Sequence, residues 1–271
     1  MINITHNKKI HRKTIEYIFV LTLCILNIIY FMEYGNYNIL RPSQIPKHLI
    51  IPIASLLCFI FLDLTLPKSK EIICDKPPIT VFFVNSIVVG FISIIISGKQ
   101  LSNKYGLAIH LLLLIILAVT YFNKRNPIRA NFNVKAKYII IIFIAFFIYK
   151  GFQALALRGY AFTPHSNITR YLAIVAWNIL YPALYEKTLY RLYLISIFKY
   201  YKLSDLTTNI LQCLIFGIVH YSIYPFKELG LVYTLMACSG QAFLGFIFGK
   251  IYIRTKSLTY PIILHVLFDV I

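Results

Sequence analysis

Three apolar stretches in the second half of the sequence each carry ionisable residues away from their ends. The first contains Glu186 and Arg191, the second contains His220, and the third contains His265 and Asp269. An ionisable side chain inside an apolar segment is costly and is usually functional. Three such stretches in succession therefore predict that these side chains meet in one polar site.

The residue types suit the activation of a water molecule. A poorly solvated carboxylate such as Glu186 can act as a general base near neutral pH. Two neutral imidazoles, His220 and His265, can bind a metal or can polarise water and a carbonyl oxygen. Asp269 can orient an imidazole or complete a ligand set. Hydrolysis of a peptide bond inside a membrane needs a water, a base and a group that stabilises the oxyanion.

The spacing within each stretch predicts which side chains share a helix face. His265 and Asp269 are four residues apart and lie on one face of an α-helix. Glu186 and Arg191 are five apart, and on an α-helix they diverge by about 140°. We therefore expect Tyr190, rather than Arg191, to share the face of Glu186.

Composition excludes an ordinary soluble domain. The 271 residues are 59% hydrophobic and 13% charged, with a mean hydropathy of +0.74, which predicts a polytopic membrane protein. The net charge of +18 lies in short loops between apolar runs, so it indicates membrane topology and contact with anionic lipids rather than nucleic-acid binding. The five scattered cysteines form neither a disulfide framework nor a CxxC metal site.

The predicted fold is an all-α transmembrane bundle of about eight spans plus a short last helix. With the N-terminus in the cytoplasm, 17 of the 27 Lys and Arg residues fall on that side and 7 fall opposite, which favours this orientation. We expect one integral membrane domain, with spans of unclear role in residues 1–157 and the functional core in residues 158–271. The runs of spanning length are 15–32, 48–66, 79–97, 105–122, 138–157, 171–198, 206–222 and 231–251, followed by the short run 258–271.

Depth estimates place the polar residues at a common level. With a rise of 1.5 Å per residue, Glu186 lies about 18 Å from the cytoplasmic end of its span, His220 about 21 Å and His265 about 12 Å. Asp269 lies one turn deeper than His265, at about 18 Å. A single site near the middle of the membrane, or somewhat toward the cytoplasm, follows from these values.

The three stretches resemble the motifs of the CPBP family of intramembrane proteases, the CAAX protease and bacteriocin-processing group also called Abi. That family carries Glu-Glu-x-x-x-Arg, then Phe-x-x-x-His, then His-x-x-x-Asn or Asp. Here the motifs appear as Glu186 to Arg191, Phe216 to His220 and His265 to Asp269. The resemblance covers residues 170–271, including the run from Gly245 into the last motif.

The resemblance implies a role for each site residue. Glu186 would activate the water, His220 and His265 would bind metal or stabilise the oxyanion, and Asp269 and Arg191 would support the site. It leaves two options open: a divalent metal such as zinc, held by Glu186, His220 and His265, or a site that works without metal.

The sequence departs from the family pattern at two places. Lys187 replaces the second glutamate of the first motif, which reverses its charge. The chain also stops two residues after Asp269, so the last helix is short or the sequence is cut short. A simpler interpretation of Lys187 and Arg191 is that both extend toward the cytoplasmic lipid headgroups.

We therefore expect a multi-pass endopeptidase in the bacterial plasma membrane, a hydrolase that cuts a membrane-associated peptide or protein. The alternative is a non-catalytic membrane protein for bacteriocin self-immunity or scaffolding, which Lys187 favours. A small transporter that uses the same residues as a proton relay is a third hypothesis, which the lack of repeated halves disfavours.

Overall fold

The computed structural model describes residues 2–34, 45–68, 79–80, 82–83, 131–156, 168–220 and 226–270. Every regular element in these ranges is a helix, so the predicted all-α fold class is confirmed. The run predicted at 105–122, and all but four residues of the run at 79–97, lie outside the described residues.

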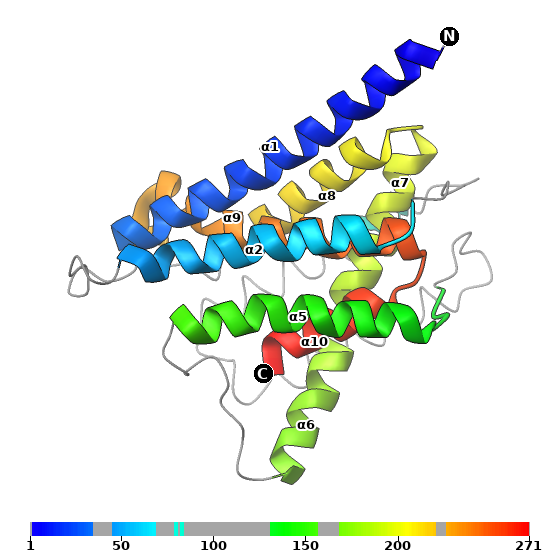
Figure 1. Cartoon of the computed structure of the whole chain (residues 1–271). Coiled ribbons are helices and arrows are strands. Elements are labelled where there is room, and N and C mark those ends of the chain that lie inside the picture. The colour runs from blue at the N-terminus through cyan, green and yellow to red at the C-terminus, as the bar shows by residue number, and fades with distance from the viewer. Residues whose placement is uncertain are drawn as a thin grey trace. The chain divides into compact units, whose positions relative to one another are not determined.

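The described helices coincide with the remaining apolar runs of the sequence (Figure 1). The run predicted at 171–198 differs from a single α-helix, because two π-helical segments interrupt it. The elements are α1 Ile2–Tyr34, α2 Ile45–Thr65, α5 Ala136–Ala156, α6 Ile168–Asn178, η2 Ile179–Leu184, η3 Lys187–Leu194, α7 Ile195–Tyr200, α8 Asp205–Val219, α9 Phe226–Thr255 and α10 Thr259–Val270.

Helix α9 contains one backbone break near its start. Gly230 has φ 71° and ψ 172°, a conformation that glycine adopts at no steric cost. The regular part of the helix therefore begins after Gly230, where the hydrophobic pattern predicted it. From Gly230 to Thr255 it is long and apolar enough to cross a membrane, and no other helix among the described residues meets both criteria. The eight-span bundle stays a prediction.

The chain divides into two compact units. The first comprises residues 1–66, 143–163 and 209–247. In it α1 and α2 lie side by side (Figure 1), and Phe246 of α9 contacts Phe19 and Phe59 with ring centroids 5.4 and 6.0 Å away. A Cβ added to Gly217 would lie 2.8 Å from the Cβ of Ala242, so α8 and α9 approach closely, as small residues permit.

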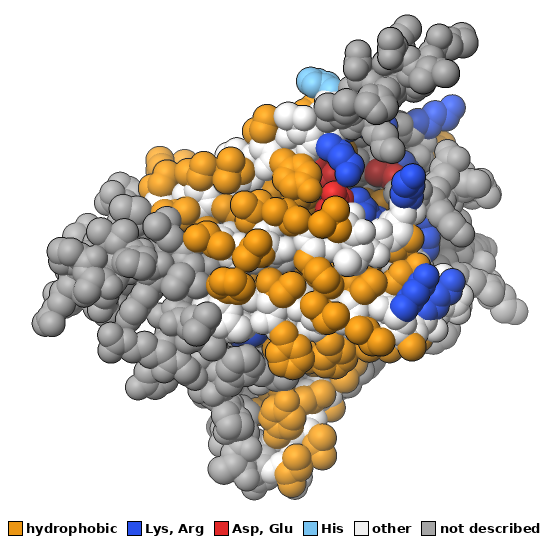
Figure 2. Space-filling view, in the orientation of Figure 1, with side chains coloured by type: hydrophobic (Ala, Val, Ile, Leu, Met, Phe, Trp, Pro, Cys, Tyr) orange, Lys and Arg blue, Asp and Glu red, His pale blue; other side chains and the backbone are white. Residues whose placement is uncertain are grey.

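The first unit buries polar groups and exposes apolar ones. Asn209 donates through Nδ2 to the Phe246 carbonyl at 3.0 Å, and Gln212 donates through Nε2 to the Gly245 carbonyl at 2.8 Å. Hydrophobic side chains cover much of the described surface of α1 and α2 in Figure 2. This pattern is typical of helices that face lipid. The exposed apolar residues of these and the neighbouring helices include Ile18, Leu21, Ile25, Ile53, Leu57, Phe143, Phe147, Ile218 and Leu231.

The second unit comprises residues 67–142, 164–208 and 248–271. In it α10 packs on α6 and η2, and its first turn is fixed to the segment that leads into α5. The Tyr260 hydroxyl accepts a hydrogen bond from the Lys135 amide at 2.6 Å, and its ring meets that of Tyr138 edge-on. The Leu258 amide donates to the Asn131 carbonyl at 2.9 Å. These contacts hold the helix that carries His265 and Asp269.

Lys202 follows the end of α7 in a left-handed backbone conformation, with φ 57°. A side chain with a Cβ is strained there, whereas glycine is not. We expect Lys202→Gly to raise the free energy of unfolding by about 0.5–1 kcal/mol, because the relief of about 1–2 kcal/mol in the left-handed conformation exceeds the extra entropy that glycine loses on folding. A higher thermal midpoint in detergent measures this gain. Lys202→Ala removes the same charge but retains the Cβ, so a gain of equal size in that variant would contradict this explanation.

Lys256 lies in the short connection between α9 and α10, and burial lowers its pKa to about 8 from 10.5, with Lys199 adding to the decrease and Asp205 opposing it. Between pH 8 and pH 10.5 the unfolded chain holds this proton while the folded chain releases it. The contribution of Lys256 to the free energy of unfolding therefore rises with pH through this window. We expect Lys256→Met to flatten the pH dependence of the thermal midpoint there. An unchanged slope would contradict this assignment.

Candidate active site

The structure brings four of the five predicted site residues into one unit. Glu186 and Arg191 lie on the π-helical stretch, and His265 and Asp269 lie on α10. His220 follows the end of α8 and belongs to the other unit. Its meeting with the other four stays a prediction.

His265 lies between two carboxylates. Its Nδ1 is 3.6 Å from Oε2 of Glu186, and its Nε2 is 3.0 Å from Oδ2 of Asp269. The imidazole is buried, Glu186 is mostly buried, and Asp269 is about one-third exposed. The predicted shared face of His265 and Asp269 is therefore confirmed, and Glu186 approaches the ring from the opposite side.

The side chain of Lys187 enters the same site. Its Nζ contacts Nδ1 of His265 and lies 3.5 Å from Oε2 of Glu186. With Lys187 charged, its ammonium only donates hydrogen bonds, and Nδ1 then accepts from it. The neutral ring then carries its proton on Nε2 and donates it to Asp269. Lys187, His265 and Asp269 form one hydrogen-bonded chain with a defined tautomer.

Phe248 of α9 forms the apolar wall of this cluster. Its ring stacks on His265, with centroids 5.4 Å apart and planes inclined by 16°. Nζ of Lys187 lies 4.0 Å from the Phe248 centroid, and Cζ of Arg191 lies 5.3 Å from it. The negative face of an aromatic ring stabilises cations in a poorly solvated site. The sequence did not predict that Phe248 belongs to the site. Its only signal was that it lies in the run that begins at Gly245 and leads into the last motif.

Lys187 and Arg191 do not extend to the lipid headgroups. Both side chains are 0% exposed, so that interpretation is wrong. The expected divergence of Arg191 from the Glu186 face assumed an α-helix, and it stays a prediction. The segment Lys187–Leu194 is π-helical, and its hydrogen bonds join residues five apart. Arg191 is thereby turned toward the ring that also contacts Lys187. Such π-helical segments are frequent at functional sites.

His220 has its own local arrangement in the first unit. Its Nδ1 lies 2.6 Å from the carbonyl oxygen of Phe216, and the two rings lie 4.4 Å apart. A carbonyl only accepts, so Nδ1 carries the proton and the lone pair of the neutral ring is on Nε2. This tautomer is compatible with a metal ligand or a hydrogen-bond acceptor, and the predicted role of His220 stays a prediction.

The residues of the second unit do not fit a divalent metal. Among the described residues, no three or more His, Cys, Asp or Glu side chains are grouped so that they could hold one. The Nδ1 lone pair of His265 accepts from Lys187, whose positive charge also faces Glu186. The ligand set Glu186, His220 and His265 stays a prediction that this geometry does not favour.

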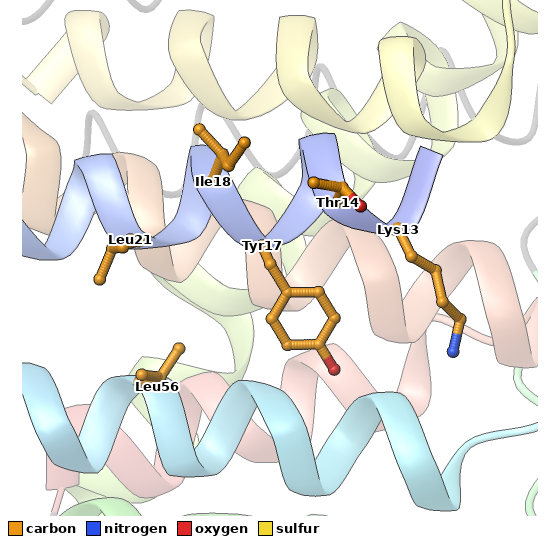
Figure 3. Close-up of a pocket in the computed structure, with 6 residues that line it drawn as sticks. All are labelled: Lys13, Thr14, Tyr17, Ile18, Leu21 and Leu56. Carbon is orange, nitrogen blue, oxygen red and sulfur yellow. The ribbon is translucent and has the colours of Figure 1, made fainter. Parts of the chain in front are cut away.

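A separate pocket of about 470 Å³ lies between α1 and α2 in the first unit. Figure 3 shows Tyr17 and Leu21 extending from α1 toward α2, and Leu56 extending from α2 toward α1. At its polar end, Lys13 lies 3.6 Å from Oδ2 of the buried Asp63. None of the predicted site residues lines this pocket, so it is distinct from the cluster on α10.

The geometry defines an all-helical protein with a buried carboxylate–imidazole site. Residues 167–271, which contain all five predicted site residues, match the family model of the type II CAAX prenyl endopeptidase Rce1-like proteins. This match agrees with the resemblance of the three motifs to the CAAX-protease family. Searches found no significant match among curated proteins or solved structures.

The contact between Lys187 and Phe248 can be measured by a double-mutant cycle. We expect Phe248→Leu and Lys187→Met each to change the free energy of unfolding, with a favourable coupling of about 1–2 kcal/mol between the wild-type side chains, because the cation lies on a desolvated ring. Thermal or denaturant unfolding of the four proteins in detergent measures it. Phe147→Leu, at an exposed ring of α5, should show no coupling to Lys187→Met, and additivity at Phe248 would contradict the contact.

Proposed function

We propose that this protein is a multi-pass intramembrane endopeptidase of the CAAX-protease type, which cleaves a membrane-associated peptide or protein near its C-terminal or transmembrane segment. The observation that carries the proposal is the meeting of Glu186, His265 and Asp269 inside the segment that matches the family. One residue of the first motif and two residues of the last motif thus lie in one cluster.

Glu186 is the proposed base. As water attacks the peptide carbonyl carbon, a proton passes from the water to the Glu186 carboxylate and the carbonyl becomes an oxyanion. Collapse of this intermediate breaks the C–N bond, and the proton moves from Glu186 to the departing nitrogen. The products are a carboxylic acid and an amine, so atoms and charge balance.

The neighbouring groups support this reaction in different ways. The hydrogen bond from His265 Nε2 to Asp269 holds the imidazole in one orientation. The positive charge on Lys187 would stabilise the oxyanion, because such an interaction is strong where water is scarce. Arg191, on the Phe248 ring, adds a second fixed positive charge nearby.

Several features support a membrane location for this chemistry. The exposed apolar side chains of the first unit form a surface suited to lipid, and the segment Gly230–Thr255 has the length and composition of a span. We propose several spans in the bacterial plasma membrane, with the N-terminus in the cytoplasm and basic loops in contact with anionic headgroups.

One observation favours a second function, a non-catalytic immunity or scaffolding protein. The ammonium of Lys187 contacts both the proposed base and His265, at the position where the family motif has a second glutamate. A protein of this kind would bind a bacteriocin or a membrane partner through the same fold without cutting it. Protection that survives Glu186→Gln would favour this function over catalysis.

Glu186→Gln tests the proposed function most directly. We expect it to reduce the cleavage rate by at least about 10²-fold, because the amide cannot accept the proton from water. The measurement uses purified protein in liposomes with a fluorogenic prenylated CAAX peptide, together with terminal-peptide profiling of membranes from expressing cells.

Glu16→Gln provides the matched control, since it removes a carboxylate from α1 in the other unit. This variant should cleave at the wild-type rate. Equal cleavage by wild type and Glu186→Gln would refute Glu186 as the base.

A further inference from the structure

We propose that the ammonium of Lys187 stands in the position of a divalent cation, so that the Glu186–His265 site excludes metal and works without it. The part of Lys187 in catalysis rests on the proposed endopeptidase function, whereas the exclusion of metal does not. The lysine that replaces the second glutamate of the first motif therefore has a function in this site.

The first argument is the use of the ligand atoms. A zinc site in this cluster would need the Nδ1 lone pair of His265 and a carboxylate oxygen of Glu186. Both atoms face the Nζ of Lys187, which contacts Nδ1 and lies 3.5 Å from Oε2. A lone pair that accepts from an ammonium cannot coordinate a metal at the same time. The second nitrogen of His265 is directed to Asp269, so the ring offers the metal no other ligand atom.

The second argument is the balance of charge. Glu186 and Asp269 contribute two negative charges to the cluster, and Lys187 and Arg191 contribute two positive charges. With His265 neutral, these five described residues together carry no net charge that would attract a divalent ion. A glutamate in place of Lys187 would make the cluster more negative by two charges. The repulsion between Lys187 and a divalent ion is also twice that between two unit charges at the same distance.

The third argument is the fixed position of Lys187. Its side chain is 0% exposed, and its Nζ lies 4.0 Å from the centroid of Phe248. Moving the ammonium away would break its contacts with Glu186, His265 and this ring together, and a buried charge without partners is costly. Lys187 is therefore a permanent member of the site rather than a gate that opens to admit metal.

These three observations give Lys187 a positive role in the reaction. The ammonium orients Glu186 and His265 toward one point, and its charge faces the place where a carbonyl oxygen would become negative. This is the contribution that a bound cation makes in metal-dependent hydrolysis. The water, the proton acceptor and the products are those of the proposed mechanism, and no further reactant is needed.

Metal binding to the purified full-length protein in detergent tests the inference. Cobalt is titrated by its visible spectrum and zinc by elemental analysis. The proteins compared are wild type, His265→Ala, Lys187→Glu and Lys187→Glu/His265→Ala. We expect the wild type to take up no metal that depends on His265. Lys187→Glu should bind about one equivalent at least tenfold more tightly, and the added His265→Ala should abolish it. The inference would be overturned if the wild type bound one equivalent of metal and lost it on His265→Ala. It would also be overturned if Lys187→Glu folded but bound metal no more tightly than the wild type.

Lys187→Met is a second test of the inference, which can be used if Lys187→Glu does not fold. It removes the charge with little change in length, so cobalt affinity should rise at least tenfold over wild type, and an unchanged affinity would count against the inference. Folding of each variant is checked by circular dichroism and gel filtration.

Cleavage assays with and without a strong chelator separate the inference from the proposed function. Cleavage that withstands the chelator supports the part of Lys187 in catalysis, whereas cleavage that the chelator abolishes refutes it. The complete absence of cleavage by the wild type refutes the proposed function, and the metal titration then decides the inference alone.

Discussion

The contact between the Lys187 ammonium and the His265 imidazole is the interaction on which the rest of the site depends. A lysine that is fully buried is tolerated only when its charge is compensated by neighbours. Here the compensation comes from Glu186, from the lone pair of His265 and from the face of Phe248. These groups belong to three separate helical elements. Stabilisation of one buried cation therefore requires all three elements to pack around it.

The π-helical backbone is the local means by which this arrangement is reached. An α-helix through residues 186–191 would direct Arg191 away from the ring that Lys187 contacts, whereas the wider turn directs both cations to Phe248. Two like charges on one ring repel each other, and Glu186 and Asp269 offset that repulsion. The cost of burying these cations is thus offset by partners that the π-helical segment brings within reach.

The hydrophobic runs of the sequence predicted the described helices, because a helix that is buried in a bundle or a bilayer must be a long apolar segment. The run at 206–222 corresponds to Asp205–Val219, and the run at 258–271 to Thr259–Val270. The pairing of His265 with Asp269 followed from their spacing, and the meeting with Glu186 from depth alone. The π-helical turn could not be predicted, since its hydrogen bonds depend on tertiary packing. The positions of Lys187 and Phe248 could not be predicted either. Lys187 contacts His265, which is 78 residues away, and Phe248, which lies on another helix.

The hydrogen bond from the Lys135 amide to the Tyr260 hydroxyl bears on which residues support the predicted site. The family match begins at residue 167, yet the helix that carries His265 and Asp269 is anchored at its first turn by residues 131–138. The family match thus covers the predicted site residues, whereas the contacts that hold their helix reach residues that precede the match. Residues 131–138 are accordingly structural partners of α10.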